Sequence, residues 1–103
     1  MLERNISVET AAAFKRSAIA TTERFAALVR EHVPELGPEA AFRFVAIAIT
    51  FSGALWSHVN PPPAVEEVYA NYPELTLMRV EFSSTLRETL ATVLAGLLVR
   101  PPR

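Results

Sequence analysis

The stretch FVAIAITFSGALWS, residues 44–57, contains no charged side chain, and none follows until Glu66. At helical spacing it places two apolar seams side by side, and the remaining flank is small rather than charged: Ala46, Thr50, Gly53 and Ser57. A surface helix has one apolar stripe and a charged back, whereas a helix that is apolar or small nearly all round is buried on several sides. The stretch therefore predicts a central helix, which a chain of 103 residues is too short to surround completely.

Further helices are predicted on both sides of this central segment. Residues 8–33 carry apolar or small residues at steps of three and four, with Ser7 as a good N-cap. The central helix is expected over residues 38–59, between a proline at its first position and a run of prolines after its end. A short helix is expected over 64–71 and a last long helix over 73–99. No segment indicates a strand, so we predict an all-α fold of three long helices and one short helix.

Composition excludes several classes of protein. Half of the residues are hydrophobic, the formal net charge is −1, and there is no cysteine. A near-neutral charge argues against nucleic-acid binding, because phosphate contacts require a basic face. Without cysteine there is neither a disulfide framework nor the usual type of zinc site. The first residues lack the apolar segment of a signal peptide, so we expect one cytoplasmic domain over residues 1–103.

A membrane span is the alternative interpretation of the uncharged run over residues 40–59. The run is near the lower length limit for spanning, but it is rich in Ala, Ser, Thr and Gly and stops at a proline cluster. Strongly apolar runs of about 10–14 residues are more often buried core helices. We therefore expect no membrane contact, and a small membrane-associated helical protein remains the third hypothesis.

No residue pattern indicates catalysis or metal binding. His32 and His58 are the only histidines and lack the spacing of a metal pair on one helix; each is explained by the negative end of a helix dipole. Ser52 lacks the flanking glycines of a nucleophile elbow, and Glu66 and Glu67 are adjacent, so their side chains point apart on a helix. We therefore predict that the chain is not an enzyme and holds no metal and no cofactor.

The aromatic residues allow two interpretations. Phe14, Phe25 and Phe82 each lie on a regular apolar stripe, which is typical of core packing. Trp56 lies in the last turns of the central helix, close to His58, and a buried indole N–H seeks a polar partner. The alternative is an apolar ligand pocket, for which Phe14, Phe25 and Trp56 are the candidate residues.

Several segments together resemble a known family. They are LERNIS followed by VETAAAFKR, then GALWSHVNPPPAVEE, YPEL, and the closing VEFSSTLRETLATVLAGLL. This pattern resembles the C-terminal regulatory domain of TetR-family transcriptional regulators over nearly the whole chain. Its most specific part is the G-A-L-W-x-x-x-N-P-P-P corner at residues 53–63, whereas the closing helix is a more generic match.

The resemblance implies that the three long predicted helices correspond to the last three long helices of the family fold. In that fold the final two helices form a four-helix bundle with their symmetry mates. The residues favour the same homodimer, because helix 38–59 has more apolar faces than its neighbours can cover and residues 89–99 are uncharged. The predicted interface residues are Phe51, Leu55, Leu86, Leu90, Val93 and Leu97.

One part of the family pattern has no counterpart in the sequence. TetR-family regulators carry an N-terminal three-helix DNA-binding domain, and nothing before Ser7 matches a recognition helix. We therefore expect a fragment of a longer regulator or a short stand-alone relative, with no DNA contact by this chain itself. The expected partners are a second copy or a full-length subunit, and the resemblance adds a small apolar effector. The alternative is a stand-alone helical module that binds another protein.

Overall fold

A computed structural model of the protein describes residues 6–102, so residues 2–5 of the family resemblance lie outside the described part. The described residues form helices and loops without a strand, which confirms the predicted all-α class. The elements are α1 (Val8–His32), α2 (Pro38–Val59), α3 (Pro63–Asn71), the 3₁₀ helix η2 (Pro73–Met78) and α4 (Phe82–Val99).

The ends of the first two helices follow from local chemistry. The Ser7 hydroxyl accepts a hydrogen bond of 3.1 Å from the backbone N–H of Thr10, as a side-chain N-cap does. Pro38 occupies the first position of α2, where its missing N–H leaves no helical bond unmade. The predicted bounds of α1, α2 and α3 are therefore confirmed to within one residue.

The prediction that the last long helix starts at residue 73 or 74 is wrong. Residues after Pro73 form the 3₁₀ helix η2, and the backbone is extended at Arg79 and Glu81 before α4 begins at Phe82. The cause is a cap that the sequence pattern did not reveal. The Glu81 carboxylate accepts hydrogen bonds from the first free amides of α4, which makes Glu81 the N-cap.

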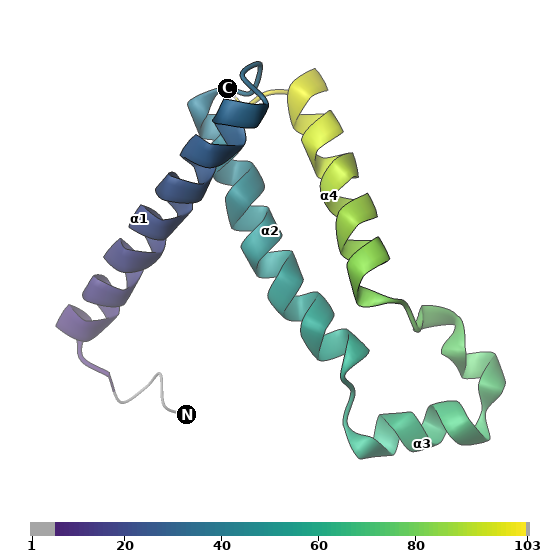
Figure 1. Ribbon diagram of the computed structural model, residues 1–103. Coiled ribbons are helices and arrows are strands. Elements are labelled where there is room, and N and C mark those ends of the chain that lie inside the picture. The colour runs from purple at the N-terminus through teal and green to yellow at the C-terminus, as the bar shows by residue number, and fades with distance from the viewer. Residues whose placement is uncertain (1–5, 103) are drawn as a thin grey trace.

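The helix α2 lies at the centre of the fold, because both α1 and α4 pack against it (Figure 1). Figure 1 shows α1 and α2 converging at the short loop that joins them and separating away from it. The buried core lies at the converging end, and its small residues allow the helices to approach closely. Its members are Ala26, Leu36, Ala40, Ala41, Val45 and Leu97.

Leu36 closes this core from the loop between α1 and α2. Its side chain is only 1% exposed. Its backbone N–H donates to the Val33 carbonyl at 3.0 Å, and its carbonyl accepts from Arg30 Nε at 3.1 Å. The loop is therefore held by both backbone groups of the residue whose side chain fills the gap between the helices.

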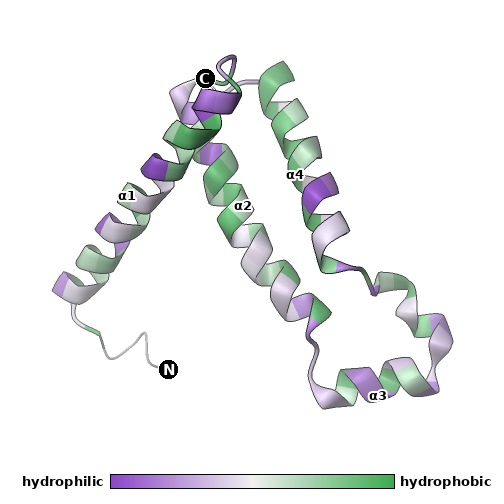
Figure 2. Ribbon diagram, viewed as in Figure 1, coloured by the Kyte–Doolittle hydropathy of each residue, from purple (hydrophilic) through white to green (hydrophobic). Residues whose placement is uncertain are grey.

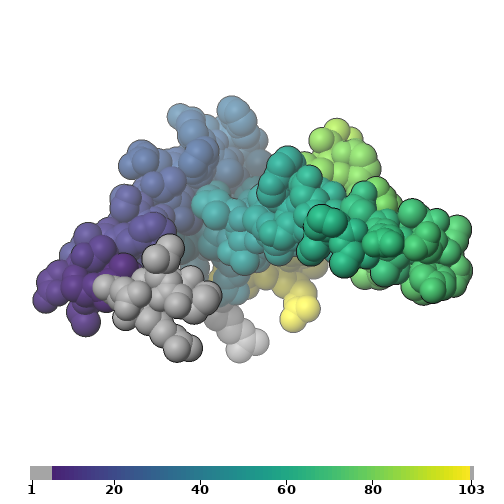
Figure 3. All heavy atoms as spheres, turned by 90° about the horizontal axis from the view of Figure 1, so that it is seen from below, coloured from purple at the N-terminus to yellow at the C-terminus, as the bar shows by residue number. Residues whose placement is uncertain are grey.

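The molecule as a whole is open rather than compact. Its radius of gyration is 17.7 Å, whereas a compact domain of about 100 residues has about 13 Å. The chain exposes 8089 Å², compared with about 5,800 Å² expected for a compact monomer of its mass. Figure 3 shows the reason: the green segment of α3 and η2 projects from one side of the body and α1 from the other.

Candidate functional site

The face of α2 that α1 and α4 leave free carries one charged residue, Arg43. Figure 2 shows that most of the α2 ribbon is coloured green or white. Among the residues that line the groove on this face, the only polar side chain apart from Arg43 is Thr50, whose hydroxyl donates to the Ala46 carbonyl at 2.9 Å. Because that hydroxyl is satisfied within the helix, the surface it leaves is apolar. A shallow groove of about 400 Å³ runs along this face and is lined by Arg43, Ala46, Ile47, Thr50, Phe51 and Ala54.

A second groove continues the first along the last turns of α2. It has a volume of about 360 Å³ and lies between α2 and the end of η2 with the residues that follow it. Phe51 and Ala54 line both grooves, so the two form one continuous surface, which we call the α2 groove. The other residues that line this second part are Leu55, His58, Leu77, Met78 and Val80.

The segment formed by α3 and η2, here called the arm, contributes apolar side chains to this surface. No residue of α3 or η2 is buried; the two helices pack mainly on each other, and η2 meets the end of α2 at Met78. Leu77 is 90% exposed and Met78 68%. Isolated exposed apolar residues are normal, but a cluster of them next to an apolar groove marks a contact surface.

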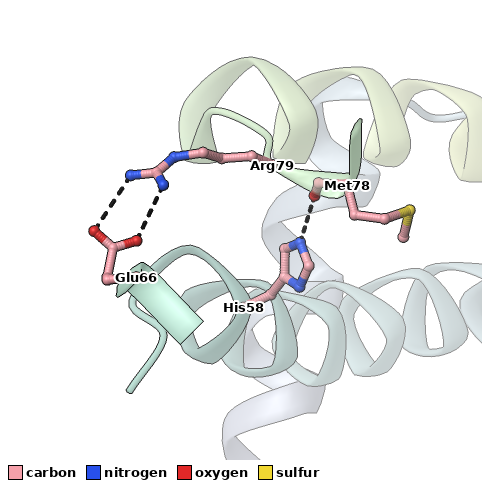
Figure 4. Close-up of polar contacts among 4 residues, drawn as sticks. All are labelled: His58, Glu66, Met78 and Arg79. Carbon is pink, nitrogen blue, oxygen red and sulfur yellow. Dashed lines mark hydrogen bonds and ion pairs between the residues drawn. The ribbon is translucent and has the colours of Figure 1, made fainter. Parts of the chain in front are cut away.

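Polar contacts hold the arm to the end of α2 (Figure 4). The His58 Nε2 atom lies 2.7 Å from the Met78 carbonyl oxygen. The Arg79 guanidinium lies 3.1 Å from one oxygen of Glu66 and 3.4 Å from the other, and 5.1 Å from the centre of the Tyr69 ring. These side chains come from α2, α3 and the segment before α4, so together they fix where the arm leaves the body.

These polar contacts are weak compared with what ordering the arm costs. Exposed ion pairs contribute at most about 1 kcal/mol, whereas fixing the backbone of one residue costs about 1–2 kcal/mol. The arm has no buried apolar side chain to offset that cost. A surface that covered Leu77 and Met78 would supply the missing apolar burial.

A separate apolar groove of about 250 Å³ lies between α1 and α2, on the side where they diverge. None of its lining residues is charged, and the Ser52 hydroxyl is satisfied by the Ala48 carbonyl. We call it the α1–α2 groove. It is lined by Phe25, Val29, Phe44, Val45, Ala48, Ile49 and Ser52.

The structure separates the three residues that the sequence suggested for ligand binding. Phe25 lines the α1–α2 groove, but Phe14 and Trp56 do not. Trp56 instead meets the edge of Phe82, with ring centroids 5.5 Å apart. The expectation that Phe14 and Phe25 pack in the core is wrong for the single chain, since they are 72% and 52% exposed. Their stripe on α1 is regular, but no helix covers it.

The six predicted interface residues fall into two groups. Leu55 and Leu97 are buried within the single chain, and Leu97 belongs to the core. Val93 packs against that core and is partly buried. Phe51, Leu86 and Leu90 are partly buried and keep apolar surface exposed. Sequence spacing alone did not separate these groups, because both lie on the same helices at the same period.

Sequence reasoning missed the arm as part of the apolar surface. The predicted regular helix over residues 73–99 placed Leu77 and Met78 on an ordinary helical turn. The one available signal was Glu81 placed two and three residues before Ser83 and Ser84, since a side chain that accepts from the next free amides can start a helix.

Charged groups at this site do not form a reactive cluster. Among residues 6–102, no group of three or more His, Asp or Glu side chains could hold a metal ion. The pKa of Glu81 lies below its ordinary value because the backbone N–H groups of Ser84 and Ser83 donate to its carboxylate. That carboxylate is fully exposed and acts as a helix cap.

The fold and these surfaces define an all-helical domain of the kind found in transcription regulators. Residues 1–101 match the family described as "Tetracyclin repressor-like, C-terminal domain", and the chain belongs to this family. The resemblance seen in the sequence is therefore confirmed, and the chain is a regulatory domain of the TetR type. Comparison with curated proteins and with solved structures gave no significant match.

By length and composition alone, α2 and α4 could also cross a membrane. Core helices of soluble proteins satisfy the same test, and regulators of this family are soluble. Their C-terminal domains generally dimerise and bind effectors, and apolar helices exposed in the single chain are what a dimer of this kind requires.

Proposed function

We propose that residues 1–103 act as one domain that dimerises and senses an effector for a TetR-like regulator. The observation that carries this proposal is the accessible surface, which exceeds that of a compact monomer by about 2,300 Å². Stable interfaces bury about 1,200–2,000 Å² over both partners, and obligate dimers bury more. Half of this area belongs to each copy, so a standard interface would cover only about 600–1,000 Å² of the excess, whereas an obligate interface of up to about 5,000 Å² would cover all of it. The excess therefore fits an obligate dimer through the free faces of α2 and α4.

In the proposed dimer, α2 and α4 of each copy form a four-helix bundle. Phe51, Leu86 and Leu90 are the contact residues of the predicted set, because they retain exposed surface. Leu55, Val93 and Leu97 support them from within the chain. A two-fold interface uses the same surface on both copies, which is the commonest arrangement among soluble oligomers.

The proposed effector site is the α1–α2 groove. Its uncharged lining suits a small neutral apolar molecule, because no polar atom of the groove is left to pair with a charge. Since α1 meets α2 closely only at the converging end, a molecule bound in this groove would change the angle between the two helices. We assign no catalysis, membrane contact or DNA contact to the chain, and we place it in the cytoplasm.

Sedimentation at micromolar concentration tests the dimer. The wild-type chain is expected to sediment as a dimer, and Leu90→Arg as a monomer or an unfolded chain, because a charge buried without a partner is strongly unfavourable. Leu28→Arg is the matched control, since Leu28 is 55% exposed on α1 and lines neither groove. A stable, well-folded wild-type monomer would contradict the proposal and favour the stand-alone interaction module.

Fluorescence titration with N-phenyl-1-naphthylamine, a neutral apolar probe, tests the effector site. The probe is expected to bind the wild-type dimer, and Ile49→Glu is expected to abolish binding by placing a charge in the α1–α2 groove. Phe14→Ser is the control, because Phe14 does not line that groove. Equal loss of binding in both variants would contradict this location.

A further inference from the structure

We propose that the arm of each copy reaches onto the other copy in the dimer and packs Leu77 and Met78 on Ala46 and Ile47 of that copy. The inference rests on the proposed dimer and adds a contact outside its four-helix bundle. It names a second copy of this chain as the occupant of the α2 groove.

The first argument is the symmetry of the α2 groove. Along α2 its lining runs from Arg43 to His58, so its midpoint falls at Thr50 and Phe51. A two-fold contact must place this surface against itself. If two copies of α2 cross antiparallel at the midpoint, the Arg43 end of one helix meets the His58 end of the other. The half-length of the groove is about 11 Å of helix, from the rise per residue.

The second argument is the position of the arm at the His58 end. The Met78 carbonyl lies 2.7 Å from His58 Nε2, and Leu77 and Met78 line the groove beside it. Their side chains are nevertheless mostly exposed, so they extend beyond the surface of their own chain. The antiparallel crossing brings them over the opposite end of the groove, which is formed by Ala46 and Ile47.

The third argument is chemical fit. The receiving surface is apolar, and the Thr50 hydroxyl is already bonded within its own helix. Leu77 and Met78 would therefore displace water there without leaving a polar group unpaired. The small side chain of Ala46 leaves space for a larger side chain from the other copy. Arg43 lies at the end of the groove, and its guanidinium is 3.9 Å from the Glu39 carboxylate, so its charge has a partner within its own chain.

The fourth argument is the open surface of the arm itself. Its own contacts are exposed polar ones, and none of its residues is buried within the chain. The α2 groove runs without interruption from the free face of α2 onto Leu77 and Met78. A second copy seated on α2 would therefore meet the arm as part of the same surface.

Charge substitutions on the full chain test the pairing. Leu77→Lys and Ile47→Glu should each raise the dimer dissociation constant by about tenfold or more, measured by sedimentation equilibrium. In an equimolar mixture, one copy carrying each change should form a heterodimer tighter than either variant homodimer, because the new charges would meet. Native mass spectrometry counts the three species when one variant is labelled with ¹⁵N, because the two substitutions change the mass by nearly the same amount. Val8→Lys, at a residue 82% exposed on α1, should change nothing.

The outcomes separate this inference from the proposed function. A folded wild-type monomer would overturn the dimer and this inference with it. A wild-type dimer whose affinity Leu77→Lys leaves unchanged would overturn the arm contact alone. Weakening by both substitutions without a preferred heterodimer would overturn the pairing of Leu77 with Ile47. Circular dichroism checks folding, and Met78→Ser serves as a second, uncharged variant of the arm, expected to weaken the dimer by a smaller factor.

Discussion

The two ends of α2 differ in how far the apolar side chains around them are covered. Near Pro38, small residues such as Ala41 let α1 and α4 pack closely, and Leu36 fills the remaining space. Near Val59, α1 has separated from α2 and only the start of α4 stays in contact, while Trp56 and Leu77 are 60% and 90% exposed. We call these the closed end and the open end. Both are rich in apolar residues, so the difference lies in what covers them.

This difference indicates that the closed end stabilises the single chain and that the open end is available for contact with a partner. The closed end has a core that a single chain completes, and it sets the position of all three long helices. The open end has apolar surface without cover in the same chain, which includes the α2 groove and the arm. A single chain can therefore order the closed end, and the open end is the part whose stability should depend on a partner.

The largest effect is expected from Leu36→Ala at the closed end. Removing a fully buried leucine costs about 2–5 kcal/mol of unfolding free energy, because a cavity remains between the helices. Since small domains have only about 5–15 kcal/mol in total, many molecules would unfold. Leu28→Ala, at an exposed position of α1, should cost less than about 0.5 kcal/mol. Urea unfolding measures both, and equal losses of unfolding free energy would contradict the burial of Leu36 in the core of the closed end.

A matched alanine pair on α2 should sharpen the comparison. Ala41→Leu forces extra volume into a site that is 0% exposed, which should cost about 1–3 kcal/mol. Ala54→Leu lies in the α2 groove, where the single chain has room for the side chain. We expect Ala54→Leu to leave helicity unchanged and to alter the dimer dissociation constant. Thermal unfolding measures the stability of each variant, and sedimentation measures its dimer dissociation constant. If both variants were monomeric and less stable than wild type, the two ends of α2 would not differ as described.

A smaller effect is expected at the open end from Phe82→Leu. The substitution removes the edge-to-face contact with Trp56, which is worth about 0.5–1.5 kcal/mol. Trp56 is the only tryptophan, so its fluorescence reports the change directly. The emission should shift to longer wavelength in the variant, and unfolding should require less urea. An unchanged spectrum would show that the two rings are not in contact in solution.

The smallest effect concerns the start of α4. Since the pKa of Glu81 is lowered in the folded chain, its cap contributes stability above the ordinary pKa of 4.5 and loses it as the pH falls through the folded pKa. Wild type should therefore melt slightly above Glu81→Gln at pH 7, and the gap should close in acid. Glu67→Gln is the control. A gap that widened in acid would contradict the cap.

Some features of the fold could be predicted because their causes are local. Ser7, Pro38 and the proline run fix helix ends through backbone bonding, which depends on neighbouring residues only. The segment after Pro73 could not be predicted in the same way. Its hydropathy suits a long helix, but the contact of His58 with the Met78 carbonyl and the Glu81 cap decide otherwise. The first of these contacts joins residues far apart in the sequence.

The candidate surfaces show the same division between local and distant causes. The uncharged face of α2 was readable from residues 44–57, because a helix places each side chain at a fixed angle. The sequence did not predict which apolar residues are covered. Leu55 and Phe51 lie on the same apolar seam of the helix, but Leu55 is buried and Phe51 only partly so. Phe14 and Phe25 are a second example, because they lie on a regular apolar stripe and are nevertheless exposed. A regular stripe indicates that another helix could cover it, but not that one does.

The sequence by itself determined the helical class, the ends of α1 and α2, the family and the apolar character of α2. These depend on short-range bonding and on periodicity, which are properties of the chain alone. Only the tertiary structure decided that α1 and α2 meet at one end and separate at the other, and that the arm exposes Leu77 and Met78. Those features depend on how small and large side chains fit together across helices, and no local pattern records that fit.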